Sequence, residues 1–272
     1  MEKTQIRAMF IGAHPDDCDF KAAGTAIKLS SIGAEVMFVS ATNGDTGHHA
    51  MGGGELARRR AEETKRSCEI AGIKHFVMDI HNNGIEANVA TREKFIRLIR
   101  EFNPTLIITH RPYDYHPDHR ITSQLVQDSS YALIIPNVCP LIPAMKHVPV
   151  ILYFQDAFKN PVSFNADIVV NIDDVMDKKI KMLDCHESQV YEWLPWTEGK
   201  LDTVPLNVEE RLDWLSKRMY LRDGMIADRF RQELIDKYGI EKGNNVKCAE
   251  AFQICEYGAQ IKKEKIDSIF PF

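Results

Sequence analysis

Residues 6–17 have the sequence IRAMFIGAHPDD, an apolar run that ends in a cluster of polar side chains. The run Ile6–Ala13 predicts a buried strand, because a strand covered on both faces is apolar at nearly every position. A helical pattern follows at Ala22–Ser31 and is closed by Gly33. A strand followed by a helix is the first unit expected of a parallel α/β sheet.

The same alternation continues through the first half of the chain. Apolar runs predict strands, and amphipathic or charged patterns predict helices between them. The strands are expected at Val36–Ala41, His75–Met78 and Leu106–Thr109, and the helices at Glu55–Ala71, Arg92–Phe102 and Asp118–Ala132. Strands and helices at this spacing form right-handed crossover units. We therefore expect an α/β fold with a Rossmann-like, doubly wound, mostly parallel sheet and helices on both faces.

The second half of the chain is less regular. Further strands are expected at Val150–Phe154, Ile168–Val170 and Ala249–Glu256, and helices at Asp174–Cys185 and Glu209–Tyr238. The segment Glu187–Pro205 predicts a long irregular loop, and loops of that length are often functional. The glycine-rich stretch Gly44–Gly54 predicts a second loop, which we expect to be mobile and to lie over the ligand pocket. Because no repeat, linker or low-complexity tract divides the chain, we expect one domain over residues 1–272.

Composition narrows the class of protein. The chain has 272 residues, 44% of them hydrophobic, and a formal net charge of −5 without a basic block, which argues against nucleic acid as a partner. No apolar run approaches the roughly 20 residues that span a bilayer, and the N-terminus lacks a secretory pattern. The 6 scattered cysteines form no C-x-x-C pair, which favours free thiols and a cytoplasmic location. A small-molecule substrate fits these features best.

Two short segments concentrate the reactive side chains. Residues 13–17 (AHPDD) follow the first strand, and residues 116–119 (HPDH) follow the strand Leu106–Thr109. Ligands of doubly wound sheets lie beyond the carboxyl ends of the strands, so both segments can face one crevice. The first strand leads into Gly12-Ala13-His14 and not into G-x-G-x-x-G, which argues against a dinucleotide site.

These segments contain the groups that metal-assisted hydrolysis needs. Two imidazoles and one carboxylate make a three-ligand zinc site that keeps one position for water. A second carboxylate can accept a proton from that water, and a further histidine can protonate a leaving amine. The six candidates are His14, Asp16, Asp17, His116, Asp118 and His119. A lone His-Pro-Asp could equally be a turn, and His-x-x-His a surface pair, but their joint occurrence at strand ends favours a metal site.

Four stretches carry a resemblance to a known family. They are AHPDDCDFKAAGT (13–25), HRPYDYHPDHR (110–120), KKIKMLDCHESQ (178–189) and AEAFQI (249–254). The chain resembles the zinc-dependent deacetylases of the LmbE/PIG-L family, which include N-acetylglucosaminyl deacetylases. The resemblance implies removal of an acetyl group from an N-acetylated amino sugar or sugar conjugate. It also implies a homo-oligomer, since family members are often trimers or hexamers.

The resemblance also implies a role for individual residues. By position, His14, Asp17 and His119 would bind zinc and Asp16 would be the general base. His116 would be the electrostatic and acid partner, tuned by Asp118. Substrate contacts are expected from Arg60, Asn83 and His186. Arg60 could equally form an i, i+3 ion pair with Glu63, and His186 could equally have a structural role.

Departures from the family pattern leave other hypotheses open. Asp19 stands where the family usually has Glu, and Asn83-Gly84 replaces an Asp-Gly that contacts sugar hydroxyls in some members. The second departure favours an alternative, a metal-dependent amidase or esterase acting on a non-sugar substrate. A non-catalytic binding protein on the same fold would be expected to have lost ligands, yet every ligand and the base are present.

Overall fold

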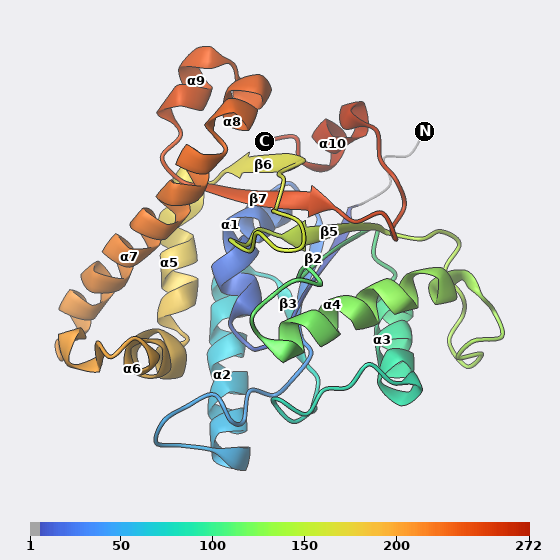
Figure 1. The fold of residues 1–272 in the computed structure, drawn as a ribbon, viewed down its shortest axis with the longest axis horizontal. Coiled ribbons are helices and arrows are strands. Elements are labelled where there is room, and N and C mark those ends of the chain that lie inside the picture. The colour runs from blue at the N-terminus through green and yellow to red at the C-terminus, as the bar shows by residue number, and fades with distance from the viewer. Residues whose placement is uncertain (1–5) are drawn as a thin grey trace.

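One mixed sheet lies at the centre of the molecule (Figure 1). The computed structural model describes residues 6–272, apart from the side chains of residues 263–265. Within these residues seven strands form a sheet of order β3-β2-β1-β4-β5-β7-β6. The strands are β1 (Arg7–Gly12), β2 (Glu35–Ser40), β3 (Lys74–Val77), β4 (Leu106–Thr109), β5 (Val150–Phe154), β6 (Ile168–Asn171) and β7 (Ala249–Ile254). Strands β1 to β5 pair in parallel, and β7 runs antiparallel to both of its neighbours.

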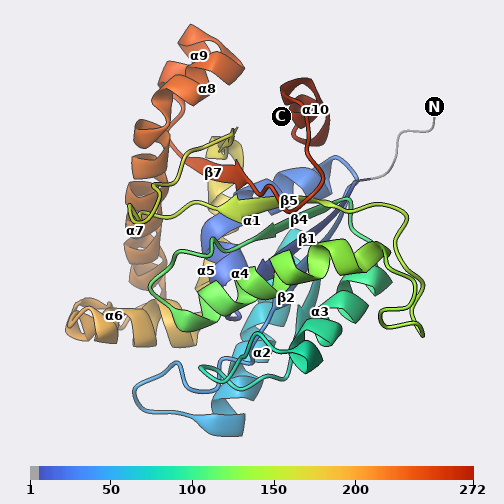
Figure 2. The same ribbon diagram turned by 45° about the vertical axis from the view of Figure 1, so that its right-hand side comes forward.

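Helices cover both faces of this sheet (Figure 2). They are α1 (Asp17–Ser31), α2 (Gly53–Ala71), α3 (Val89–Phe102), α4 (Pro117–Ser130), α5 (Met176–Asp184), α6 (Leu194–Thr197), α7 (Val208–Arg229), α8 (Arg231–Tyr238), α9 (Ile240–Asn245) and α10 (Lys263–Ile269). Short turns are the 3-10 helices η1 (Tyr131–Ile134), η2 (Asp173–Val175) and η4 (Leu201–Thr203) and the π-helix η3 (Ser188–Trp193). No helix in the described part of the chain is both long and apolar enough to cross a membrane.

The pattern of β1 explains the two covered faces. Ala8 and Phe10 belong to an apolar cluster with residues of α1, α5 and α7, whereas Met9 and Ile11 belong to a cluster with residues of α3 and α4. Because successive side chains of a strand point to opposite faces, a strand covered on both sides must be apolar throughout. The predicted fold class is confirmed.

The largest differences from the sequence expectation concern three segments. Helix α1 begins at Asp17 and not at Ala22, because the carboxylates in its first turn interact favourably with the helix N-terminus. The segment Glu187–Pro205 is not an irregular loop but contains η3, α6 and η4. Its Pro195 lies in the first turn of α6, where a missing N–H does not break a helix. The helix expected over Glu209–Tyr238 is divided into α7 and α8.

A buried ion network joins four elements on one face of the sheet. Lys179 of α5 is completely buried, and its Nζ lies 2.8 Å from both Asp223 Oδ2 of α7 and Glu250 Oε1 of β7. Glu250 also accepts hydrogen bonds from the backbone N–H groups of Gly24 and Thr25 in α1. The network therefore fixes α1, α5 and α7 against the sheet.

We expect Lys179→Met to lower the free energy of unfolding by about 3–5 kcal/mol, because it leaves the buried carboxylate of Glu250 without its cation. Urea unfolding followed by circular dichroism measures the change. The matched control is Lys217→Met, which removes an exposed ion pair with Asp213 and should change stability by less than about 0.5 kcal/mol. Equal stability of the two variants would show that the network contributes little.

Candidate functional site

The two motifs meet at the carboxyl ends of the central strands. Strands β1 and β4 are neighbours, with Ile11 paired to Thr109, so the residues after each strand emerge side by side. The sheet order reverses between these two strands, and such a switch point is where doubly wound folds bind ligands. His14 follows β1, His116 is the N-cap of α4, and His119 lies in the first turn of that helix.

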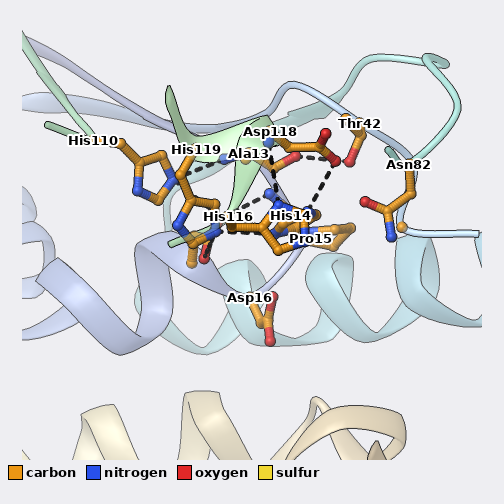
Figure 3. A network of polar contacts seen from close by, with 12 residues as sticks. Ala13, His14, Pro15, Asp16, Thr42, Asn82, His110, His116, Asp118 and His119 are labelled. Carbon is orange, nitrogen blue, oxygen red and sulfur yellow. Dashed lines mark hydrogen bonds and ion pairs between the residues drawn. The ribbon is translucent and has the colours of Figure 1, made fainter. Parts of the chain in front are cut away.

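Three donor groups come together at this point. His14 Nδ1 lies 3.2 Å from His119 Nε2. The Asp17 carboxylate directs one oxygen at each ring, with Oδ2 3.4 Å from His14 Nδ1 and Oδ1 3.4 Å from His119 Nε2. Figure 3 shows the imidazoles of His14, His116 and His119 gathered in one cluster. The predicted ligands are thus brought into mutual contact, although 105 residues separate the two histidines in this pair.

Two overlapping groups of side chains could hold a metal ion here. One consists of His14, His116 and His119, and the other of Asp17, His110 and His119. In each group the ligand atoms all lie within 4.8 Å of one another. His119 belongs to both groups, which makes it the central ligand candidate.

In His14 and His119, the ring nitrogen that faces away from the other histidine lies next to a carboxylate. Asp118 Oδ2 lies 3.2 Å from His14 Nε2, and Asp114 Oδ1 lies 3.0 Å from His119 Nδ1. Histidines that bind metals usually direct their second nitrogen at such a group, which fixes the ring and its tautomer. We expected Asp118 to tune His116, and its carboxylate does favour the charged form of that ring, but its direct contact is with His14. Asp114 was missed, although it stands two residues before His116 in the same motif.

The carboxylates stabilise positive charge at the cluster. Burial alone would lower the pKa of His119, but Asp17 and Asp114 outweigh it and raise that pKa to about 10. Burial would raise the pKa of Asp17, but the neighbouring His119 and His110 hold it well below its usual range. A site with this charge distribution favours a cation.

His116 has the opposite electrostatic environment. Burial, followed by the positive charges of His14 and His119, lowers its pKa to about 4. Asp118 favours the charged form of His116, as expected, but burial and the two neighbouring histidines outweigh its effect. The His116 Nδ1 accepts a hydrogen bond of 3.2 Å from the backbone N–H of Asp118, so the neutral ring carries its proton on Nε2. His116 lines the cavity and can donate a hydrogen bond there as a neutral group.

Asp16 is held by a buried arginine. Its Oδ1 accepts a hydrogen bond of 2.9 Å from Arg60 Nη2, and Arg60 Nη1 donates to the carbonyl of Gly44 at 3.3 Å. Figure 3 shows that Asp16 points away from the imidazoles. Arg60 is only 2% exposed, so its charge is largely committed to Asp16. This geometry makes Arg60 a positioning residue for Asp16 more than a free substrate contact.

A cavity of about 530 Å³ opens over the cluster. Its lining includes Asp16, Arg60 and Asn83 together with His14, Asp17, His116 and His119. His186 does not line it, and the expected substrate contact is not found there. This side chain is completely buried, with its Nε2 3.3 Å from Asp19 Oδ2, because the turn after α5 directs it under α1 and away from the crevice.

Two segments meet at the rim of the cavity. Thr46 and Gly47 of the stretch Gly44–Gly54 and Gln189 and Trp193 of η3 all contribute to the lining. Gln189 Nε2 donates to the carbonyl of Gly47 at 3.1 Å. His48 Nε2 lies 2.7 Å from Glu192 Oε2, and this pair also joins the stretch Gly44–Gly54 to η3. The loop predicted over the pocket is therefore bonded to the π-helix.

The comparisons with known proteins bear on this site. Residues 9–130, which contain both motifs, match the model of the family described as GlcNAc-PI de-N-acetylase (PIG-L). The diacetylchitobiose deacetylase of Thermococcus kodakarensis is 32% identical over 74% of this chain and 76% of its own. The chain belongs to the PIG-L family. It is thus a member of a family of deacetylases, as the sequence motifs predicted.

Two further proteins are similar to this chain, one in sequence and one in fold. A probable N-acetyl-alpha-D-glucosaminyl L-malate deacetylase 2 of Bacillus cereus is 31% identical over 69% of this chain and 86% of its own. The crystal structure of the 4-carboxy-2-hydroxymuconate hydratase of Pseudomonas putida superposes with a TM-score of 0.72 at 20% identity, over 95% of this chain and 98% of that one. That likeness shows the fold alone, and a fold does not determine a reaction.

Proposed function

We propose that this protein is a zinc-dependent hydrolase that removes the acetyl group from an N-acetylated amino sugar or sugar conjugate. The observation that carries the proposal is the contact among His14, Asp17 and His119 at the base of the cavity. Membership of the PIG-L family and the deacetylase relatives support it.

The donor set fits zinc. Ligands bonded at about 2.0–2.1 Å in a tetrahedron lie about 3.3–3.4 Å apart. The distances among His14 Nδ1, His119 Nε2 and the Asp17 oxygens are 3.2–3.4 Å. Two imidazoles and one carboxylate are a usual set for a catalytic zinc ion, with one position left over. When bound, zinc would activate a water molecule and polarise the amide carbonyl.

The surrounding residues would move protons and hold the substrate. Asp16 would accept the proton of the attacking water as general base, while Arg60 keeps its carboxylate in place. The neutral His116 would donate a hydrogen bond from Nε2 to the oxygen of the amide as charge develops on it, and Asp16 would return the proton taken from the water to the departing amine. Asp118 would orient His14, and Asn83 at the cavity wall would contact substrate hydroxyls.

The direct test is acetate release. Zinc-loaded protein should liberate acetate from N-acetylglucosamine or its conjugates, measured by a coupled acetate assay against protein treated with a chelator. Removal of the metal should abolish release, and addition of zinc should restore it. Release only from acylated amines that are not sugars would favour the alternative amidase, and release from no acylated compound would contradict the proposal.

A further inference from the structure

A second polar region lies in the same cavity, away from the imidazole cluster. Lys21 of α1 and Arg222 of α7 both contribute to the lining, beside the apolar side chains of Phe20, Phe158 and Met219. Arg222 Nη1 donates to the carbonyl of Phe20, the residue before Lys21, so the two cations approach the same turn of α1.

Lys21 has no carboxylate partner. Its Nζ donates to the carbonyl of Gln155 at 3.0 Å, and among the described side chains no acidic group lies within ion-pair distance of it. Burial, followed by the positive charge of Arg222, lowers the pKa of the Lys21 amine. Asp114, Asp17 and Asp156 oppose this lowering without forming an ion pair with Lys21, so an anion in contact with Nζ would stabilise the partly buried ammonium further.

Of the acidic groups of the cavity wall, Asp17 and Asp114 contact histidines of the cluster, and the other three pair with arginines. Asp16 pairs with Arg60, Asp156 lies 2.9 Å from the buried Arg111, and Glu198 lies 2.7 Å from Arg218. Arg222 shares Asp223 with the buried Lys179 through its Nη1, and its Nη2 has no hydrogen-bond partner among the described residues. Donors of Lys21 and Arg222 therefore remain for a ligand.

Lys21 lies on the same helix as Asp17, one of the proposed metal ligands. Lys21 follows Asp17 by four residues on α1, so both side chains lie on one face of the helix, about 6 Å apart along its axis. If the amide of a ligand lies at the imidazole cluster, another group of the same ligand, a few bonds from the amide, would therefore reach Lys21. The apolar neighbours would strengthen the charge interaction by excluding water.

We infer that Lys21 and Arg222 form a subsite for an anionic group of the substrate, a carboxylate or a phosphate carried near the N-acyl amine. This inference rests on the proposed deacetylation and narrows its substrate class. It favours N-acetylated sugar conjugates with an acidic substituent over neutral oligosaccharides.

Kinetics with matched substrates tests the inference. Three N-acetylglucosaminides are compared: one with a neutral, one with a carboxylate-bearing and one with a phosphate-bearing aglycone. The wild-type kcat/KM should be at least about tenfold higher for an anionic compound, since a charge-assisted hydrogen bond is worth about that factor. The better of the two anionic compounds identifies the group. No preference over the neutral compound would overturn the inference and leave the proposed function intact.

Variants of Lys21 test whether this residue causes the preference for an anionic substrate. Lys21→Met should lower the ratio of anionic to neutral kcat/KM at least about tenfold, mainly through KM, and Lys21→Arg should restore part of it. The control is Lys28→Met on the same helix, outside the cavity and paired with Asp174, which should keep the wild-type ratio. A preference that survives Lys21→Met would contradict the assignment.

Binding can be measured without turnover. Calorimetric titration with inorganic phosphate and with L-malate should show at least about tenfold weaker binding to Lys21→Met than to the wild type. If no acetate is released from any substrate, the proposed function fails, and this titration alone decides the subsite. Equal affinity of the two proteins would refute it.

Discussion

His119→Ala protein should emerge from purification without bound metal and without deacetylase activity. His119 belongs to both groups of residues that could hold a metal, so every arrangement of ligands in the cluster loses a member. Two remaining protein ligands do not complete a tetrahedral site. Metal analysis by mass spectrometry after dialysis, together with acetate release, measures both losses. Full occupancy in this variant would show that the metal lies elsewhere.

Companion variants separate the proposed ligand set from the group of three histidines. Asp17→Asn should also lose the metal, whereas His116→Ala should keep it, if the ligands are His14, Asp17 and His119. The reverse pattern would favour the group of three histidines. Asp114→Asn removes only the carboxylate beside His119 and should weaken metal affinity by about 10–100-fold without changing the ligand set.

Asp16→Asn should retain the metal and lose roughly 10²–10⁴-fold in kcat, the usual contribution of a general base. The amide has the shape of the carboxylate, and its oxygen can still accept the hydrogen bond of Arg60, so the local structure should persist. An amide cannot take up the proton of the attacking water. Metal content and kcat are measured on the same preparation, which separates binding from chemistry.

A control of identical chemistry accompanies this variant. Asp79→Asn changes an exposed carboxylate after β3 that does not line the cavity, and it should leave kcat unchanged. If Asp16→Asn also retains activity within a few-fold, another group activates the water, and the contact with Arg60 would then be structural.

Most of the fold could be predicted because apolar periodicity and strand-end motifs report on burial directly. In the run Ile6–Ala13 apolar residues occupy positions on both faces of the strand. This pattern is expected of a strand that is covered on both faces. The alternation of strands and helices along the first half of the chain followed from the spacing of such runs. Segments that mix Pro, Trp and charge, such as Glu187–Pro205, carry no clear period, and tertiary contacts with the neighbouring loop accompany their helical form.

Part of the residue set that meets at the cavity was predictable from the motifs, but the contacts within it were not. The motifs placed His14, Asp17 and His119 together, yet the spacing could not show which nitrogen faces which carboxylate. Asp118 lies beside His14 because α4 begins at Pro117 and turns that side chain across the crevice. Lys21 was missed because the predicted helix began after it. The predicted elements therefore did not place Lys21 and Asp17 on one face of the same helix.

The pairing of β1 with β4 has a consequence for folding. A metal held between His14 and His119 would close a loop of 105 residues across the two central strands. The unfolded chain does not bring these side chains together, so the ion would bind the native state almost exclusively. Such binding adds about 4 kcal/mol to the free energy of unfolding when the free ion is a thousandfold above its Kd. The melting temperature should therefore rise with metal supply, and a cell short of the ion would hold less of this protein in folded form.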